Sequence, residues 1–134
     1  MIKTEIKILI VDDLPTMQKI LIHQIKQAGF ENVVMASSVI EAMERLQAEK
    51  IDLVLSDWRM PDKDGLDLLA AMKTDEALAK ISFILITAED GKENIVKAIK
   101  SGVTDYIVKP LSAKILEDKI HEVFTGKHNS NASA

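Results

Sequence analysis

Five short apolar segments recur along this chain of 134 residues, and each is followed by a stretch in which apolar residues have helical spacing. The apolar segments, several of them rich in Val and Ile, are expected to be strands at 6–11, 32–36, 52–56, 81–86 and 105–108. Strands that alternate with helices predict an α/β fold. We expect a doubly wound parallel sheet of five strands, with five helices on its two faces, in three layers.

Apolar residues three or four positions apart mark each expected helix. The first helix follows Pro15, whose missing N–H costs nothing in a first turn, and is closed by Gly29. Its expected stripe is Met17, Ile20, Leu21, Ile25 and Ala28. The later stripes are Ala42, Met43 and Leu46; Leu68, Leu69 and Met72; Ile95, Ala98 and Ile99; and Leu116, Ile120, Val123 and Phe124. We therefore expect one domain over residues 1–124 and a polar, aperiodic, disordered tail over 125–134.

Composition argues against several classes of protein. The chain has no cysteine, which leaves no disulfide or thiolate metal site and fits a cytoplasmic protein. No run of about 18 apolar residues occurs, so we expect no membrane insertion. The net charge is 17 − 21 = −4, without a basic cluster, which argues against a nucleic-acid partner. A free monomer is the default expectation.

Polar residues stand where four of the expected strands end. In chain order they are Asp12 with Asp13, Asp57, Thr87 and Lys109. Because the ends of parallel strands share the edge where open α/β sheets bind ligands, these side chains should converge. Three carboxylates in one crevice raise each other's pKa unless a cation compensates. Oxygen ligands without Cys or His suit a hard ion, so the cluster predicts Mg²⁺.

Asp57 is the expected nucleophile of this site and would form an aspartyl phosphate. Lys109 would offer a point charge to the phosphoryl oxygens, and Thr87 a hydroxyl. Each residue also has a plain structural interpretation: Asp13 as a helix cap, Thr87 as a strand-end cap and Lys109 as a solvated charge. Their coincidence at the ends of different strands favours the site.

A wider set of residues surrounds these strand ends: Asp12-Asp13, Asp57, Met60-Pro61, Asp64-Gly65, Thr87-Ala88, Tyr106 and Lys109-Pro110. Together they resemble the receiver domain, the phosphorylated module of bacterial two-component signalling, from about Lys7 to Phe124. Segments such as Ser56-Asp57-Trp58 and Thr87-Ala88-Glu89 resemble the single-domain chemotaxis regulators of that family. The resemblance implies a flavodoxin-like sheet with strand order 2-1-3-4-5.

The resemblance also implies a role for each matching residue. Asp57 would accept a phosphoryl group from a histidine kinase, and Thr87 and Lys109 would contact that group. The implied Mg²⁺ ligands are Asp12, Asp13, Asp57 and the main-chain carbonyl of Arg59. Thr87 and Tyr106 would move on activation and reshape the face made by the fourth helix, fifth strand and fifth helix. The bond between Lys109 and Pro110 would be cis.

The implied function is a single-domain response regulator. It would be a signalling switch and not an enzyme, although it would catalyse its own phosphorylation and dephosphorylation. Its partners would be a histidine kinase, a phosphatase and a downstream target, which in chemotaxis is the flagellar motor switch. Differences on the output side, such as Leu111 where chemotaxis regulators carry Phe, leave the target open.

Other functions remain open at this stage. The chain could be a phosphate sink or relay intermediate with no motor target, and only partner binding would separate that case. An aspartyl-phosphate phosphohydrolase is disfavoured, because Arg59 stands where its acid/base carboxylate is expected, two residues beyond Asp57. A flavin-binding protein is disfavoured because acidic strand ends oppose an anionic cofactor.

Arg59 departs from the chemotaxis regulators, which usually carry Asn at this position. Glu89 stands two residues beyond Thr87, so both side chains should flank the mouth of the site. We predict an Arg59–Glu89 ion pair that hinders the attacking water and lengthens the phosphorylated lifetime. Exposed pairs of this kind are often weak.

Overall fold

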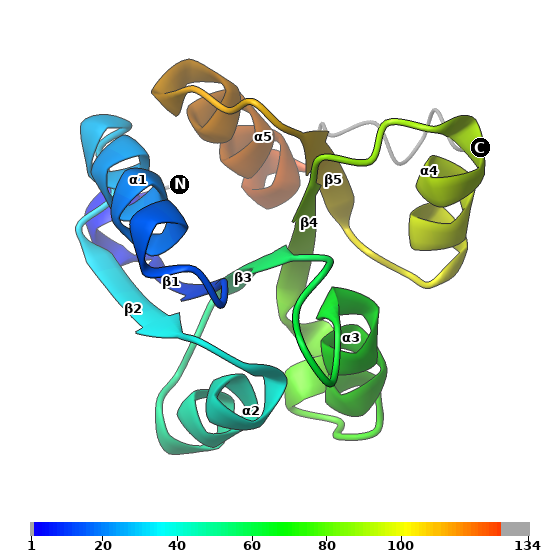
Figure 1. The fold of residues 1–134 in the computed structure, drawn as a ribbon. Coiled ribbons are helices and arrows are strands. Elements are labelled where there is room, and N and C mark those ends of the chain that lie inside the picture. Colours follow the sequence, from blue (N-terminus) through cyan, green and yellow to red (C-terminus); the bar gives the residue numbers. More distant parts are fainter. Residues whose placement is uncertain (1, 127–134) are drawn as a thin grey trace.

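The computed structural model describes residues 2–126 and contains one five-stranded parallel sheet (Figure 1). The strand order β2-β1-β3-β4-β5 confirms the predicted topology. The strands are β1 (Lys7–Val11), β2 (Asn32–Ala36), β3 (Leu53–Asp57), β4 (Ser82–Thr87) and β5 (Asp105–Val108). All four strand pairings are parallel, as crossover helices require.

The five predicted helices are present and separate into two layers (Figure 1). They are α1 (Pro15–Gln27), α2 (Val39–Ala48), α3 (Gly65–Lys73), α4 (Lys92–Lys100) and α5 (Ala113–Thr125). Two short 3₁₀ turns, Lys3–Glu5 and Leu78–Lys80, were not predicted. Helix α5 ends one residue beyond the expected domain end, and Gly126 caps it in the left-handed conformation. The rest of the expected tail, 127–134, lies outside the described residues.

Each face of the sheet has its own apolar core. Ile8 and Ile10 pack with α1 and α5, whereas Leu9 and Val11 pack with residues of α2, α3 and α4. Successive residues of a strand point to opposite faces, so a strand covered on both sides must be apolar at nearly every position. This explains the continuous apolar runs of the sequence. Over the described residues, no helix is long and apolar enough to cross a bilayer.

The buried stripe of α1 differs from the prediction. Gln18, Leu21 and Ile25 are the buried residues of this helix, whereas Ile20 is 43% exposed. Leu21, Ile25 and Ala28 are buried as predicted, and the stripe differs in that Gln18 is buried where Ile20 was expected. Ile99 of α4 was also expected inside and is 45% exposed. Period alone does not decide which of two adjacent apolar positions faces the sheet.

Candidate functional site

Three carboxylates meet at the carboxyl edge of the sheet, as the sequence predicted. Asp12 follows β1, Asp57 is the last residue of β3, and β1 pairs with β3 with Val11 opposite Ser56. This register places the two aspartates side by side, and Asp13 joins them. One oxygen atom from each carboxylate lies within 4.8 Å of the others. Sequence positions 12 and 57 are therefore neighbours in space.

Asp12 is fully buried and only partly satisfied. Its Oδ1 accepts a hydrogen bond from the Leu14 backbone N–H at 2.9 Å, while its Oδ2 is buried without a hydrogen-bond partner among the described residues. Burial raises the pKa of this carboxyl above its usual value of 3.8, and the neighbouring Asp57 adds to the effect. A buried carboxylate oxygen without a donor is costly, and a hard cation is a partner that would satisfy it. The donor set thus fits Mg²⁺.

Asp57 has one cationic neighbour. Its side chain is 12% exposed, its Oδ1 accepts from the Trp58 N–H at 3.0 Å, and the Lys109 Nζ lies 3.5 Å from the same oxygen. Burial nevertheless raises the pKa of Asp57 by more than Lys109 lowers it. One lysine at this distance therefore compensates only part of the charge of three carboxylates.

The strand-end residues Thr87 and Lys109 lie on adjacent strands. Thr87 is the last residue of β4 and 3% exposed, and its Oγ1 accepts from the Glu89 N–H at 3.0 Å. The Lys109 N–H donates to the Thr87 carbonyl oxygen at 2.8 Å, and the peptide bond from Lys109 to Pro110 is cis, as predicted. Tyr106 lies opposite Leu85 on β5 and is half-buried. The structure does not test the predicted movement of Thr87 and Tyr106.

The loop after β3 turns back over the site through Gly65. The Gly65 N–H donates to the Trp58 carbonyl oxygen at 2.8 Å. A Cβ at this position would overlap the Asp57 carbonyl oxygen and lie 2.9 Å from a methyl group of Leu85. Asp64 then caps α3 in a reciprocal capping box with Asp67. Only glycine allows this close approach.

Arg59 and Glu89 form the predicted ion pair. Two hydrogen bonds join them, one of them from Arg59 Nη2 to Glu89 Oε1 at 3.0 Å, and the hydrogen bond from Arg59 lowers the pKa of Glu89. Arg59 also lies 4.3 Å from the centre of the Trp58 ring and 3.9 Å from the Asp64 carboxylate. The pair connects the loops after β3 and β4. Its effect on a phosphorylated lifetime stays a prediction.

Asp13 does not have the capping role that was its alternative interpretation. Leu14 is the N-cap residue of α1, and no side chain caps this helix. The helix begins at Pro15, which has no N–H to satisfy, so a cap is less needed at this end. Asp13 is thus left available at the acidic cluster.

The sequence interpretation missed two buried polar residues beside the acids. Among the described residues, the buried polar or charged ones are Asp12, Gln18, Ser56 and Thr87. Ser56 donates from its hydroxyl to the Asp57 carbonyl oxygen at 2.8 Å, and Gln18 donates to the Asp12 carbonyl oxygen at 2.6 Å. The spacing of Gln18 from Leu21 and Ile25 was the signal that could have found it. Buried polar side chains thus gather at this edge.

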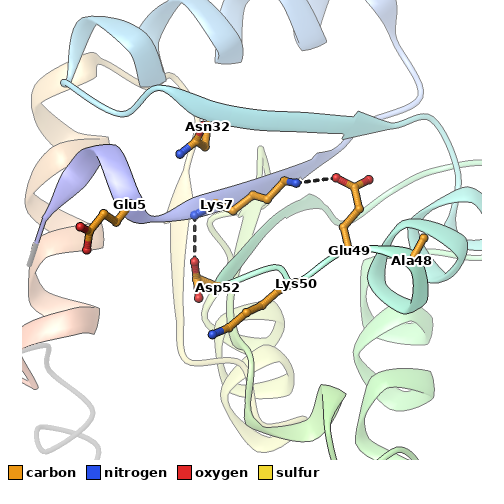
Figure 2. A pocket seen from close by; sticks show the side chains of 7 residues that line it. All are labelled: Glu5, Lys7, Asn32, Ala48, Glu49, Lys50 and Asp52. Atoms are coloured by element: carbon orange, nitrogen blue, oxygen red, sulfur yellow. Dashed lines mark hydrogen bonds and ion pairs between the residues drawn. The ribbon is translucent and has the colours of Figure 1, made fainter.

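An open pocket of about 630 Å³ lies at the opposite, amino edge of the sheet (Figure 2). Its lining residues are Glu5, Lys7, Asn32, Ala48, Glu49, Lys50 and Asp52. The Lys7 Nζ lies 2.6 Å from Glu49, and the Lys7 N–H donates to Asp52 at 2.9 Å. Because Lys7, Glu49 and Asp52 pair with each other, these residues connect neighbouring elements, and we interpret their role as structural.

Known proteins share both the fold and the sequence pattern. Residues 8–121 match the family model of the response regulator receiver domain. Chemotaxis protein CheY of Pseudomonas aeruginosa is 38% identical over 118 residues, covering 88% of this chain and 95% of that protein. Chemotaxis protein CheY1 of Helicobacter pylori is 40% identical over 118 residues, covering 87% and 95%.

Solved structures agree with this similarity. Chemotaxis protein CheY4 of Vibrio cholerae matches with a TM-score of 0.81 at 25% identity, covering 88% of this chain and 98% of that chain. The receiver domain of a signal transduction histidine kinase from Syntrophus aciditrophicus matches with a TM-score of 0.80 at 30% identity, covering 90% of both chains.

Proposed function

This chain belongs to the response regulator receiver domain family, and on that premise we propose that Asp57 accepts a phosphoryl group from a histidine kinase in a reaction that requires Mg²⁺. The observation that carries the proposal is the convergence of Asp12, Asp13 and Asp57 within 4.8 Å, with Lys109 3.5 Å from Asp57. Acids so placed repel an anionic donor unless a cation neutralises them, and the unsatisfied Asp12 Oδ2 favours such a cation.

Each residue of the site has a part in the proposed transfer. A carboxylate oxygen of Asp57 forms a bond to phosphorus while the bond from phosphorus to the donor nitrogen breaks and its electrons stay on the kinase histidine. Asp12, Asp13, Asp57 and the main-chain carbonyl of Arg59 would hold Mg²⁺, which supplies charge neutralisation. Lys109 stabilises charge on the phosphoryl oxygens, and Thr87 offers a hydroxyl after a short movement.

The proposed consequence is a change at the output face, defined as the exposed surface of α4, β5 and α5. Thr87 pairs with Val108 on β5, the strand that also carries Tyr106, so a movement of Thr87 toward the phosphoryl group would act on β5. Val96 and Ile99 on α4 are 38% and 45% exposed, which gives this face apolar surface for a partner. The protein would act as a two-state switch and not as an enzyme with a separate substrate.

The chemotaxis relatives suggest the output. Because these relatives are chemotaxis proteins, we propose a chemotaxis target, with a flagellar motor switch protein as the first candidate. Failure of the phosphorylated chain to bind such a protein would leave the receiver function standing and favour a phosphate sink or relay role. Binding that requires Asp57 would support the motor assignment.

The Arg59–Glu89 pair supports a further part of the proposal, a long phosphorylated lifetime. The pair connects the loops that follow the strands ending in Asp57 and Thr87. A water molecule that attacks a phosphoryl group on Asp57 would have to pass this region. We propose that the pair slows hydrolysis without affecting acceptance of the phosphoryl group from a kinase.

Trp58 provides the test of the proposed function, since it is adjacent to Asp57 and almost fully buried. Its fluorescence is recorded during titration with Mg²⁺ and then with acetyl phosphate, and intact mass is measured in parallel. We expect a saturable Mg²⁺ response and the addition of one phosphoryl group, which Asp57→Asn abolishes. An unaltered mass in the parent chain, or phosphorylation of the Asp57→Asn variant, would refute the assignment.

A further inference from the structure

Gln18 occupies a place on α1 where an apolar side chain would be expected. It is only 8% exposed and belongs to the buried stripe with Leu21 and Ile25. Burying an amide costs free energy unless its polar groups find partners, whereas Leu or Met would fill such a position without that cost. Packing alone therefore does not explain why an amide is buried at this position.

The Gln18 amide has two acceptors, and one belongs to the acidic cluster. Its Nε2 donates to the Asp12 carbonyl oxygen at 2.6 Å and to the Ser37 Oγ at 3.1 Å. The Ser37 N–H in turn donates to Glu41, whose own N–H donates to the Ser38 hydroxyl at the start of α2. Gln18 thus links the end of β1 to a hydrogen-bonded corner between β2 and α2.

The bond from Gln18 fixes the peptide unit between Asp12 and Asp13. The Asp12 N–H donates to the Ala36 carbonyl oxygen at 3.1 Å, so Asp12 is held on its amino side by β2 and on its carboxyl side by Gln18. A peptide unit is planar, so holding its carbonyl oxygen also sets the direction in which Asp13 leaves. On the other side of Asp13, the Leu14 N–H donates to Asp12 Oδ1 at 2.9 Å. Gln18 and this bond together fix the backbone from which Asp13 projects, and Gln18 is the side chain that holds the Asp12 carbonyl.

We propose that Gln18 is a positioning residue for the divalent cation, acting through the Asp12–Asp13 peptide. It does not touch the cation. It holds the two consecutive carboxylates at the separation from Asp57 that a hard ion needs, within 4.8 Å. This inference rests on the proposed function, because it assumes that the cluster binds Mg²⁺. Residues that orient metal ligands typically change metal affinity by 10- to 100-fold when they are replaced.

Gln18→Met tests this role, because it keeps the length of the side chain and removes both donors. Gln24→Met is the matched control, since Gln24 lies on the same helix and its Nε2 also donates to a loop carbonyl, that of Leu111, at 3.0 Å. Mg²⁺ is titrated against Trp58 fluorescence, and thermal unfolding is followed with and without Mg²⁺. We expect the Kd for Mg²⁺ to rise about tenfold in Gln18→Met and to stay unchanged in Gln24→Met.

Thermal unfolding separates positioning from plain structural support. A merely structural role would lower Tm equally with and without Mg²⁺, whereas a positioning role reduces the rise in Tm that Mg²⁺ produces. Gln18→Leu lacks the same donors but differs in shape, so it should show the same loss of Mg²⁺ affinity. It replaces Gln18→Met in the test if the Met variant does not fold. Ser37→Ala should keep the Kd within about twofold, because the bond from Gln18 to Asp12 remains.

Three results would overturn the proposal, and they are distinguishable. An unchanged Kd in both Gln18 variants refutes the positioning role and leaves the metal site intact. A loss in Ser37→Ala as large as that in Gln18→Met places the effect in the β2–α2 corner and not in the Asp12–Asp13 peptide. No saturable Mg²⁺ response in the parent chain refutes the metal site itself, and the positioning role with it.

Discussion

Strand β3 has an aspartate at each end, and the two carboxylates have opposite surroundings. Asp52, just before the strand, accepts from the Lys7 N–H at 2.9 Å (Figure 2). Its own N–H donates to the Lys7 carbonyl oxygen at 2.9 Å. Asp57, the last residue, faces two other carboxylates with one lysine 3.5 Å away. The Asp52 carboxylate thus has its partner within the protein, whereas the three carboxylates at the other end of the strand share one lysine.

The same contrast extends to the neighbours of each aspartate. At the amino edge, hydrogen bonds from Lys7 and Arg45 hold the pKa of Glu49 below its usual value of 4.5. At the carboxyl edge, burial raises the pKa of Asp12 and of Asp57 above 3.8. A lowered carboxyl pKa means that the charged form stabilises the fold, whereas a raised carboxyl pKa means that the charged form destabilises it. The buried charges at the carboxyl edge thus lower the stability of the metal-free fold, and a bound cation can restore it.

The largest expected effect comes from the backbone at the carboxyl edge. In Gly65→Ala the new Cβ meets a main-chain oxygen, that of Asp57, which cannot turn away as a side chain can. We expect a loss of about 3 kcal/mol in the free energy of unfolding, at the upper end for overpacking. Gly91→Ala is the control, since its nearest atom is 3.7 Å away. Urea unfolding measures both variants, and equal losses would show that Gly65 is not specially constrained.

The two aspartates of β3 should respond to neutralisation with opposite signs. Without metal, Asp57→Asn should raise the free energy of unfolding, because it removes a buried and repelled charge. Asp52→Asn should lower it by about 1 kcal/mol, because the amide is a weaker acceptor for the Lys7 N–H. In saturating Mg²⁺ the benefit of Asp57→Asn should disappear. The same sign for both variants in metal-free urea unfolding would contradict the comparison.

The pH dependence of stability should also differ between the edges. Asp57 has a raised folded pKa, so the metal-free fold binds its proton more tightly than the unfolded chain, and this stability is lost as pH rises from about 3.8 through the folded pKa. Glu49 has a lowered folded pKa, so its contribution is present above pH 4.5 and is lost as pH falls through the folded pKa.

Paired variants measured across pH in EDTA test this difference. The advantage of Asp57→Asn over the parent chain should grow as pH rises above 3.8, because only the parent then carries the buried charge. The disadvantage of Glu49→Gln should grow toward pH 4.5 and vanish in acid, because protonated Glu49 and Gln are both neutral. Curves that run parallel to the parent would show that neither carboxyl contributes to the pH dependence.

The smallest effect on stability is expected at the exposed Arg59–Glu89 pair. The Arg59 side chain is 54% exposed, so Arg59→Asn should leave Tm nearly unchanged. The phosphorylated form should nevertheless lose its phosphoryl group several-fold faster, because water reaches Asp57 more freely. Glu89→Gln is the companion variant, which breaks the ion pair and leaves Arg59 in place. An unchanged dephosphorylation rate in Arg59→Asn would remove the lifetime hypothesis.

The acids of the site could be predicted because their placement follows from chain direction. Parallel strands end at one edge, so residues that close strands in the sequence meet in space, and Asp12 and Asp57 do so. Even the Arg59–Glu89 pair could be predicted, since each residue stands two positions beyond a strand-end residue. Gln18 was missed although its spacing from Leu21 and Ile25 fits the stripe, because the helix period also permits the apolar Ile20 to face inward.

Sequence patterns alone predict the alternation of strands and helices, the edge at which the acids gather and, through the motifs, the family. These properties depend on residue order and on periods of two and 3.6 residues, which are local. Only the packed fold shows that Gln18 is buried and reaches the Asp12 carbonyl, and that the amino edge pairs its charges while the carboxyl edge does not. Such contacts depend on how the helices pack against the twisted sheet, and this arrangement is fixed only when all the side chains pack together.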